Sequence, residues 1–214
     1  MTNKYYLDAN STTVVEGKTL HQIVANHNIT TIAGNISAGT AGGYIQYEGV
    51  NLRHDDQVKV GNTTYTSWIT AGKILDNAQV TGGAVVNGSG VLIHGDAIVD
   101  GLCNITGTAD IKDKARITGT ATVTGASKVF ENSLIAGNAT ISGNSTIFGE
   151  ARIMGNANLS DDVTVFGKAT IKDSVTCSGG NTSSQAVIYG DAVISGNYTL
   201  TGRQIVNGNT KLTS

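Results

Sequence analysis

The chain contains no proline and has few aromatic or charged residues. Among its 214 residues, 5% are aromatic and 14% are charged, whereas glycine reaches 28. So little charge argues against a disordered chain, and glycine without a three-residue period excludes collagen. The 14 basic and 16 acidic residues give a net charge of -2. This balance leaves no basic footprint for direct nucleic-acid binding.

Signals for export or membrane insertion are also absent from the sequence. Residues 1–6 lack the basic-then-apolar pattern of a signal peptide. No apolar run approaches the ~18 residues that a membrane span needs. We therefore expect a cytoplasmic protein with no membrane partner.

A six-residue repeat dominates the second half of the chain. Its unit is a small residue, any residue, Ile/Val/Leu, any residue, Gly or Asp, and any residue. From Ala97 to Cys177 the unit recurs without a slip. Residues 181–185 then interrupt it, and it resumes at Ala186. Such a period is the signature of a solenoid.

Side-chain alternation explains how the unit folds. In a short strand the Ile or Val points inward and its two neighbours point outward. Gly or Asp permits the sharp corner, and we expect the Asn or Asp that often follows to tolerate unusual dihedrals as well. Three sides of six residues close an 18-residue coil. The pattern predicts an all-β fold: a single-stranded, three-sided parallel β-helix whose coils hydrogen-bond to one another.

Two regions are predicted. Residues 1–65 form an irregular N-terminal cap, with a helical turn at Thr19–Ala25 and strands at Thr30–Ile36 and Tyr44–Tyr47. Residues 66–214 form the β-helix, which is regular from about residue 91. Cys103 and Cys177 fall on inward positions, so we interpret them as core residues in a reducing compartment and not as a disulfide or metal pair.

The repeat resembles the hexapeptide-repeat family, whose left-handed β-helix is known from many acyltransferases. The likeness is strongest to bacterial and phage proteins with I-x-G-N-A-x-[IV] runs that are labelled as acyltransferases. These also carry an element similar to residues 39–45 followed by Asn51-Leu52. One departure is that glycine stands one residue later than is usual in the family. The resemblance implies a left-handed β-helix and a phage or prophage origin; it implies activity far less.

Outward residues recur every 18 positions, so each face of the solenoid can be read as columns. The first face is mixed. The second carries only Ser, Thr and Asn: Asn104/Thr106, Thr122/Thr124, Thr140/Ser142, Asn158/Ser160, Thr176/Ser178 and Thr199/Thr201. The third face carries Leu92/His94, Asp110/Lys112, Lys128/Phe130, Thr146/Phe148, Thr164/Phe166 and Val187/Tyr189.

The third face holds the candidate binding site. All three Phe residues share one column and Tyr189 continues it, so stacked rings are expected. An apolar stripe on a surface usually marks an interface. The predicted interface residues are Phe130, Phe148, Phe166, Tyr189, Lys112 and Lys128. The alternative is an internal stack, shielded by residues 181–185 or by the N-terminal cap.

Catalytic signals are weak. Only His94 lies in the regular coils, where an acyltransferase of this family would need a general base, and the repeat places no matched carboxylate with it. His21, His27 and His54 lie in the cap, away from a subunit boundary where three zinc ligands could meet. No nucleophile elbow, phosphate-binding glycine loop or zinc-spaced cysteine pair occurs. We therefore expect neither metal nor cofactor.

The sequence favours a non-enzymatic interaction or structural protein that binds itself, as a dimer or trimer, and another protein. With a phage origin, it could inhibit a host defence complex in the host cytoplasm or belong to a virion fibre. A homotrimeric acyltransferase that uses His94 is the alternative. Ice binding by the hydroxylated second face is more distant, because exposed strands favour Thr in any case.

Overall fold

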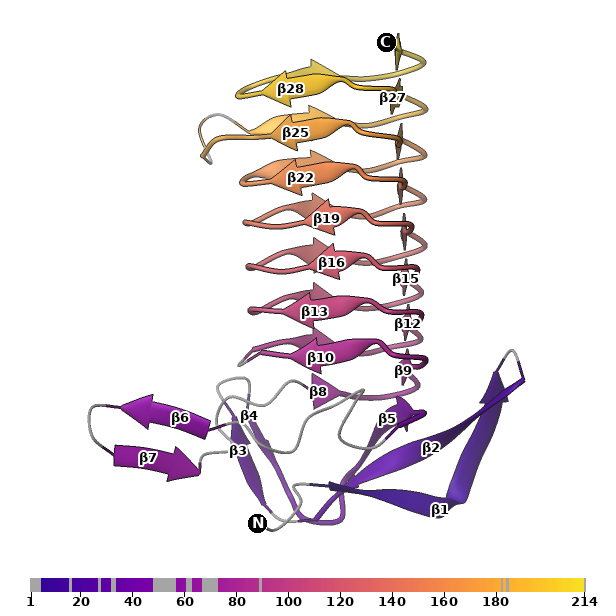
Figure 1. The fold of residues 1–214 in the computed structure, drawn as a ribbon, viewed down its shortest axis with the longest axis vertical. Coiled ribbons are helices and arrows are strands. Elements are labelled where there is room, and N and C mark those ends of the chain that lie inside the picture. Colours follow the sequence, from indigo (N-terminus) through magenta and orange to yellow (C-terminus); the bar gives the residue numbers. More distant parts are fainter. Residues whose placement is uncertain are drawn as a thin grey trace.

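The computed structural model describes residues 5–15, 17–26, 28–31, 34–47, 57–60, 63–66, 73–88, 90–181, 183 and 185–213. Every regular element among them is a strand. Three parallel sheets form the sides of a stack of coils (Figure 1). The expected three-sided, all-β solenoid is confirmed.

The first-face sheet has eleven strands, three of them from the N-terminal segment. Its strands are β1 (Tyr5–Val15), β2 (Lys18–Ala25), β5 (Ala41–Ile45), β9 (Gln79–Val80), β12 (Ile98–Val99), β15 (Arg116–Ile117), β18 (Leu134–Ile135), β21 (Arg152–Ile153), β24 (Thr170–Ile171), β27 (Val193–Ser195) and β30 (Lys211–Thr213).

The second-face sheet has seven strands: β10 (Val85–Asn87), β13 (Asn104–Thr106), β16 (Thr122–Val123), β19 (Thr140–Ile141), β22 (Asn158–Ser160), β25 (Thr176–Ser178) and β28 (Thr199–Thr201). The third-face sheet has eight: β8 (Lys73–Ile74), β11 (Leu92–Ile93), β14 (Asp110–Ile111), β17 (Lys128–Val129), β20 (Thr146–Ile147), β23 (Val163–Val165), β26 (Ala186–Ile188) and β29 (Ile205–Val206).

The pairing register follows the 18-residue period. Thr122 pairs with Thr140, and Lys128 pairs with Thr146. The inward residues of all three sheets and the small corner residues form one continuous buried core, in which Ile105, Ile117 and Ile147 are 0% exposed. Paired coils begin at β8, so the regular stack starts earlier than residue 91. The single extra residue near Gly90 weakened the sequence signal there without breaking the ladder.

The corners require a residue with a positive φ, in the left-handed region of backbone dihedrals. Gly125 has φ of 71°, and a Cβ on it would lie 2.5 Å from the carbonyl oxygen of Gly143 in the next coil. Glu131 stands at a corner where other coils have glycine, and it has φ of 59°. Its Oε2 accepts the Gly149 N–H at 2.9 Å, and this hydrogen bond offsets part of the cost of a positive φ for a residue that has a Cβ. At most described corners the positive φ falls on this corner position; before the insertion it falls on Gly180, one residue later. The expectation that an Asn or Asp after the corner residue shares the unusual dihedral was wrong.

The N-terminal segment closes one end of the stack with strands. β5 pairs in parallel with β9 and antiparallel with β2, and β2 pairs antiparallel with β1. The helical turn expected at Thr19–Ala25 was wrong, because this segment is part of β2. The helix-like spacing of Leu20, Ile23 and Val24 also suits a strand that is covered by neighbours. This arrangement protects the solenoid edge beneath β9.

Two further hairpins precede the stack. The strand expected at Thr30–Ile36 is two antiparallel strands, β3 (Ile29–Thr31) and β4 (Gly34–Ile36), and β6 (Gln57–Val60) pairs with β7 (Thr63–Thr66). The strand expected at Tyr44–Tyr47 overlaps β5, which ends at Ile45. Among the described residues, no helix has the length and hydropathy of a membrane span.

Candidate functional site

The third face carries four aromatic rings in one stack, which we call the aromatic column: Phe130, Phe148, Phe166 and Tyr189. Neighbouring ring centroids are 5.0 Å apart, and the interplanar angles are 2°, 5° and 3°. Each ring follows the inward residue at the end of its strand. The strand register therefore fixes both the spacing and the parallel orientation. The predicted column is confirmed as a structural unit.

The aromatic column is half-buried, not fully exposed. Stacking covers both faces of Phe148 and Phe166 and one face of Phe130 and of Tyr189, so the ring edges are the surface that the middle rings can offer a partner. A stack whose rotamers are fixed by its neighbours presents apolar edges with little conformational entropy left to lose on binding. The column therefore has the physical properties of a rigid contact surface.

Polar groups close both ends of the column. Lys112 Nζ lies 5.3 Å from the centroid of the Phe130 ring, a cation–π contact. At the other end, Asn207 Nδ2 donates a hydrogen bond to the Tyr189 hydroxyl at 3.1 Å. Lys128 lies on the same sheet, two residues before Phe130, and its side chain is exposed. The structure thus places all six predicted interface residues on the third face.

The five inserted residues, 181–185, fall between β25 and β26 in the chain, and residues 181, 183 and 185 of them are described. The Gln185 amide donates a hydrogen bond to the Thr164 hydroxyl, in the other outward column of the third face. This contact places Gln185 at the edge of the third face that adjoins the second face. The aromatic column lies nearer the opposite edge.

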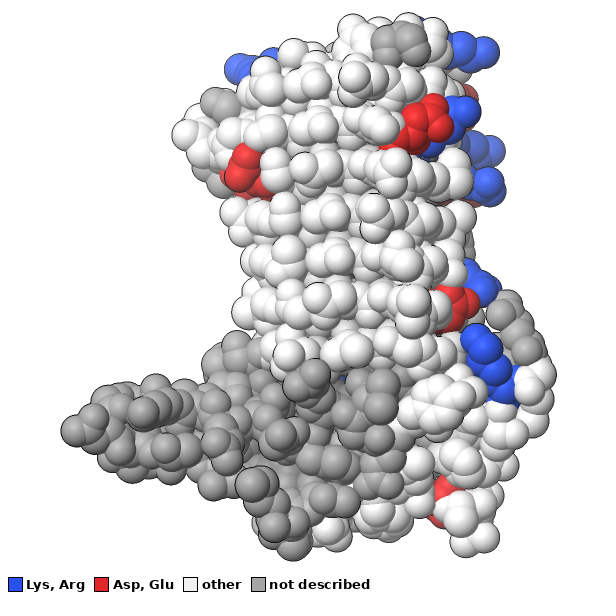
Figure 2. Space-filling view, in the orientation of Figure 1, with Lys and Arg blue, Asp and Glu red and all other residues white. Residues whose placement is uncertain are grey.

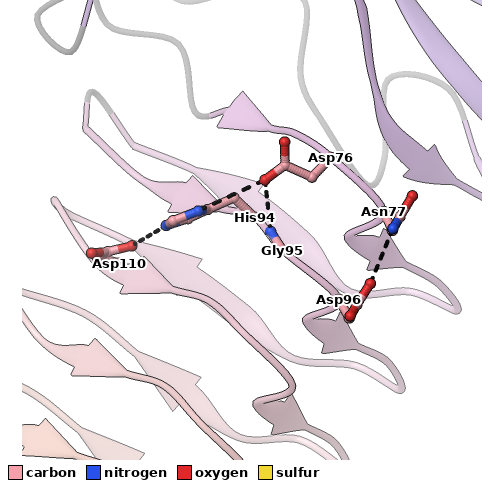
Figure 3. A network of polar contacts seen from close by, with 6 residues as sticks. All are labelled: Asp76, Asn77, His94, Gly95, Asp96 and Asp110. Carbon is pink, nitrogen blue, oxygen red and sulfur yellow. Dashed lines mark hydrogen bonds and ion pairs between the residues drawn. The ribbon is translucent and has the colours of Figure 1, made fainter.

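His94 has carboxylate partners, contrary to the expectation from the sequence. Its Nε2 lies 3.1 Å from Asp110 Oδ1, and its Nδ1 lies 3.9 Å from Asp76 Oδ2 (Figure 3). Asp76 Oδ2 also accepts the Gly95 N–H at 2.9 Å, which fixes the Asp76 side chain. Because Asp110 engages Nε2, a base at His94 would have to act through Nδ1. The 18-residue period could have indicated Asp110, which lies one coil beyond Leu92.

The two cysteines occupy the core, as predicted. Cys103 and Cys177 are free thiols, 1% and 0% exposed. Burial raises the pKa of Cys103 to about 11 and the pKa of Cys177 to about 12. Because the thiolate is the reactive form, neither is suited to nucleophilic or redox chemistry.

A metal centre finds no support among the described residues. They contain no group of three His, Cys, Asp or Glu side chains that could hold a metal ion. His21 lies in β2, and its Nδ1 is buried without a hydrogen-bond partner. His27 and His54 lie outside the described residues.

The second face contrasts with the third. Figure 2 shows the molecule with β10 to β28 of the second face toward the viewer. In this view the charged residues of the coils lie toward the left and right edges of the stack. Apart from Val85 in β10, the columns of the second face consist of hydroxyl and amide side chains, and Thr106 donates a hydrogen bond to Thr124 at 2.8 Å. Cross-strand hydrogen bonds between hydroxyl groups of this kind are common on exposed Thr-rich sheets.

No protein-family model matches the chain, and no curated protein matches it.

Proposed function

We propose that this chain is a non-catalytic binding protein, a rigid solenoid that contacts other protein chains, a second copy of itself included, through the aromatic column. The observation that carries the proposal is the single stack of Phe130, Phe148, Phe166 and Tyr189 at 5.0 Å spacing. Aromatic residues are enriched in the buried centres of interfaces, whereas Ser is depleted. The aromatic column fits that composition, and the columns of the second face do not.

The resemblance to phage repeat proteins supports a phage or prophage origin as part of the same proposal. A partner would then belong to the host, for example to a defence complex. A rod that presents a fixed surface could occlude such a complex without any chemistry of its own.

Sedimentation velocity over a concentration series tests the contact between copies. We expect the parent to assemble, Phe148→Asp to sediment as a monomer, and Thr140→Asp to match the parent. Thr140 is the control because it points outward from the second face and belongs to the six-residue unit directly before the unit of Phe148. An unchanged mass for Phe148→Asp, or a parent that stays monomeric throughout, would contradict self-association through the column.

Acyl transfer is the second candidate, and the contact between His94 and Asp110 favours it, because a carboxylate can orient a catalytic imidazole. Turnover of acetyl-coenzyme A by the parent, abolished in His94→Ala, would establish it. We expect no turnover in the parent, because the remaining ring nitrogen, Nδ1, faces a second carboxylate, with Asp76 Oδ2 at 3.9 Å.

A further inference from the structure

An open hollow lies at the corner where the third face meets the first. Its volume is about 480 Å³. The residues that line it are Lys114, Arg116, Asn132, Ser133, Leu134, Glu150 and Arg152. Asn132 and Glu150 each follow a ring of the aromatic column by two residues, so the hollow and the column flank one corner.

The order of side chains in one column creates the hollow. Arg116 pairs with Leu134, and Leu134 pairs with Arg152, so a short apolar side chain stands between two long basic ones. Leu134 provides an apolar floor, and the arginines form walls two coils apart. Parallel strands repeat at roughly 4.8 Å, so the walls stand about 10 Å apart, which is enough for a carboxylate-bearing side chain.

Positive charge dominates the hollow. Arg116 Nη2 is paired with Asp100 Oδ2 at 2.7 Å. No carboxylate of the described residues lies within ion-pair distance of Lys114 or Arg152, although Glu150 shares the hollow. Arg152 and Lys114 are exposed, so both can meet an incoming anion. A guanidinium group recognises a carboxylate through two parallel hydrogen bonds.

We propose that this hollow binds Asp or Glu side chains of a protein segment that sits across the corner on the aromatic column; the inference rests on the proposed function. Glu150 at the rim lowers the local positive charge, which suits single carboxylates better than phosphate groups. The partner surface thus combines apolar groups for the rings with acidic groups for the hollow. Charge complementarity of this kind sets orientation and association rate.

The probe is a capped hexaglutamate peptide, titrated into the full chain by calorimetry at low ionic strength. We expect binding that weakens about three- to tenfold in the double variant Lys114→Gln with Arg152→Gln. The matched control is Arg203→Gln with Lys211→Gln, which removes two exposed cations from the last coil and should leave the affinity unchanged. Binding should also weaken as salt is added.

Three results would overturn the proposal: no binding to the parent, equal loss in both double variants, or binding of inorganic phosphate without binding of hexaglutamate. Phe148→Gln separates this proposal from the proposed function. It should abolish assembly yet keep peptide binding within about twofold, because it leaves both cations in place. If Phe148→Gln no longer assembles and the parent does not bind the peptide, only the proposal about the hollow is rejected. If Phe148→Gln still assembles and the parent binds the peptide, only the proposal about the aromatic column is rejected.

Discussion

The second and third faces share one backbone geometry and differ mainly in the side chains that point outward. Both are parallel ladders with an 18-residue register, and both bury an Ile or Val in every described coil except those with Leu159, Cys177 and Leu200 on the second face. From β13 onward the columns of the second face hold hydroxyl and amide groups, whereas on the third face four rings stack. In a solenoid the outward positions recur in every coil, so the residues in each column set the chemistry of a face without changing the fold.

The largest expected effect is one that the two faces share. Ile141→Ala on the second face and Ile147→Ala on the third should each lower the free energy of unfolding by about 2–5 kcal/mol, because both side chains are fully buried. Urea denaturation measures both. A large loss for one and none for the other would mean that the faces differ in their core as well as in their surface.

A corner substitution should cost somewhat less. Gly125→Ala places a Cβ 2.5 Å from the Gly143 carbonyl oxygen and forces alanine to φ of 71°. We expect a loss of about 1–3 kcal/mol in the same assay. Thr108→Ala, at an exposed corner position that needs no positive φ, is the control and should cost little. Equal stability of the parent and Gly125→Ala would contradict the described corner geometry.

Outward substitutions should separate the faces. Phe148→Ala should lower stability by about 1–2 kcal/mol, because it removes a half-buried ring from between two others. Thr140→Ala on the second face should cost less than about 0.5 kcal/mol. Similar losses for the two would show that stacking adds nothing beyond ordinary strand packing.

The thiols provide a further check on the core. In the folded chain, Cys103 and Cys177 should react with a thiol reagent at pH 8 at least about 100-fold more slowly than in the unfolded chain. Because burial raises both pKa values above 9.0, the folded chain favours the neutral thiols. The two thiols therefore contribute to the free energy of unfolding in full below pH 9. This contribution is lost as the pH rises toward 11 and 12, because the unfolded chain ionises first. Rapid modification at pH 8 would contradict burial.

The smallest effect concerns His94. Asp110→Asn should change the free energy of unfolding by less than about 1 kcal/mol, because the contact is partly exposed. Asp96→Asn, at an exposed corner nearby, is its control. A loss of several kcal/mol would assign the His94 contact a structural role that its exposure does not suggest.

The six-residue period was sufficient to predict which residues point inward, which form corners and which share an outward column. Inward Ile105, the corner glycines and the ring column all follow from counting in steps of six and eighteen. The N-terminal segment has no period, and the spacing of Leu20, Ile23 and Val24 fits helix and strand alike. Antiparallel pairing with β1 and β5 decides the outcome, and that pairing is not local.

The candidate site was predictable to the same extent. The rings of Phe130 to Tyr189 share a column that can be read from the sequence. Of the two partners of His94, Asp110 follows from the 18-residue period, whereas Asp76 does not, because Asp76 belongs to the weak repeats before residue 91. The basic hollow depends on the relative lengths of Arg116, Leu134 and Arg152, and it becomes visible only once their side chains stand next to one another.

Site-specific photo-crosslinking tests the central claim most directly. A benzoylphenylalanine replaces Thr146 on the third face or Thr140 on the second; both are half-buried and directly precede an inward Ile. After irradiation in the producing cell, the account predicts discrete covalent adducts, with the chain itself or with another protein, from position 146 and not from position 140. Adducts that form equally from both positions, or from position 140 alone, would contradict it.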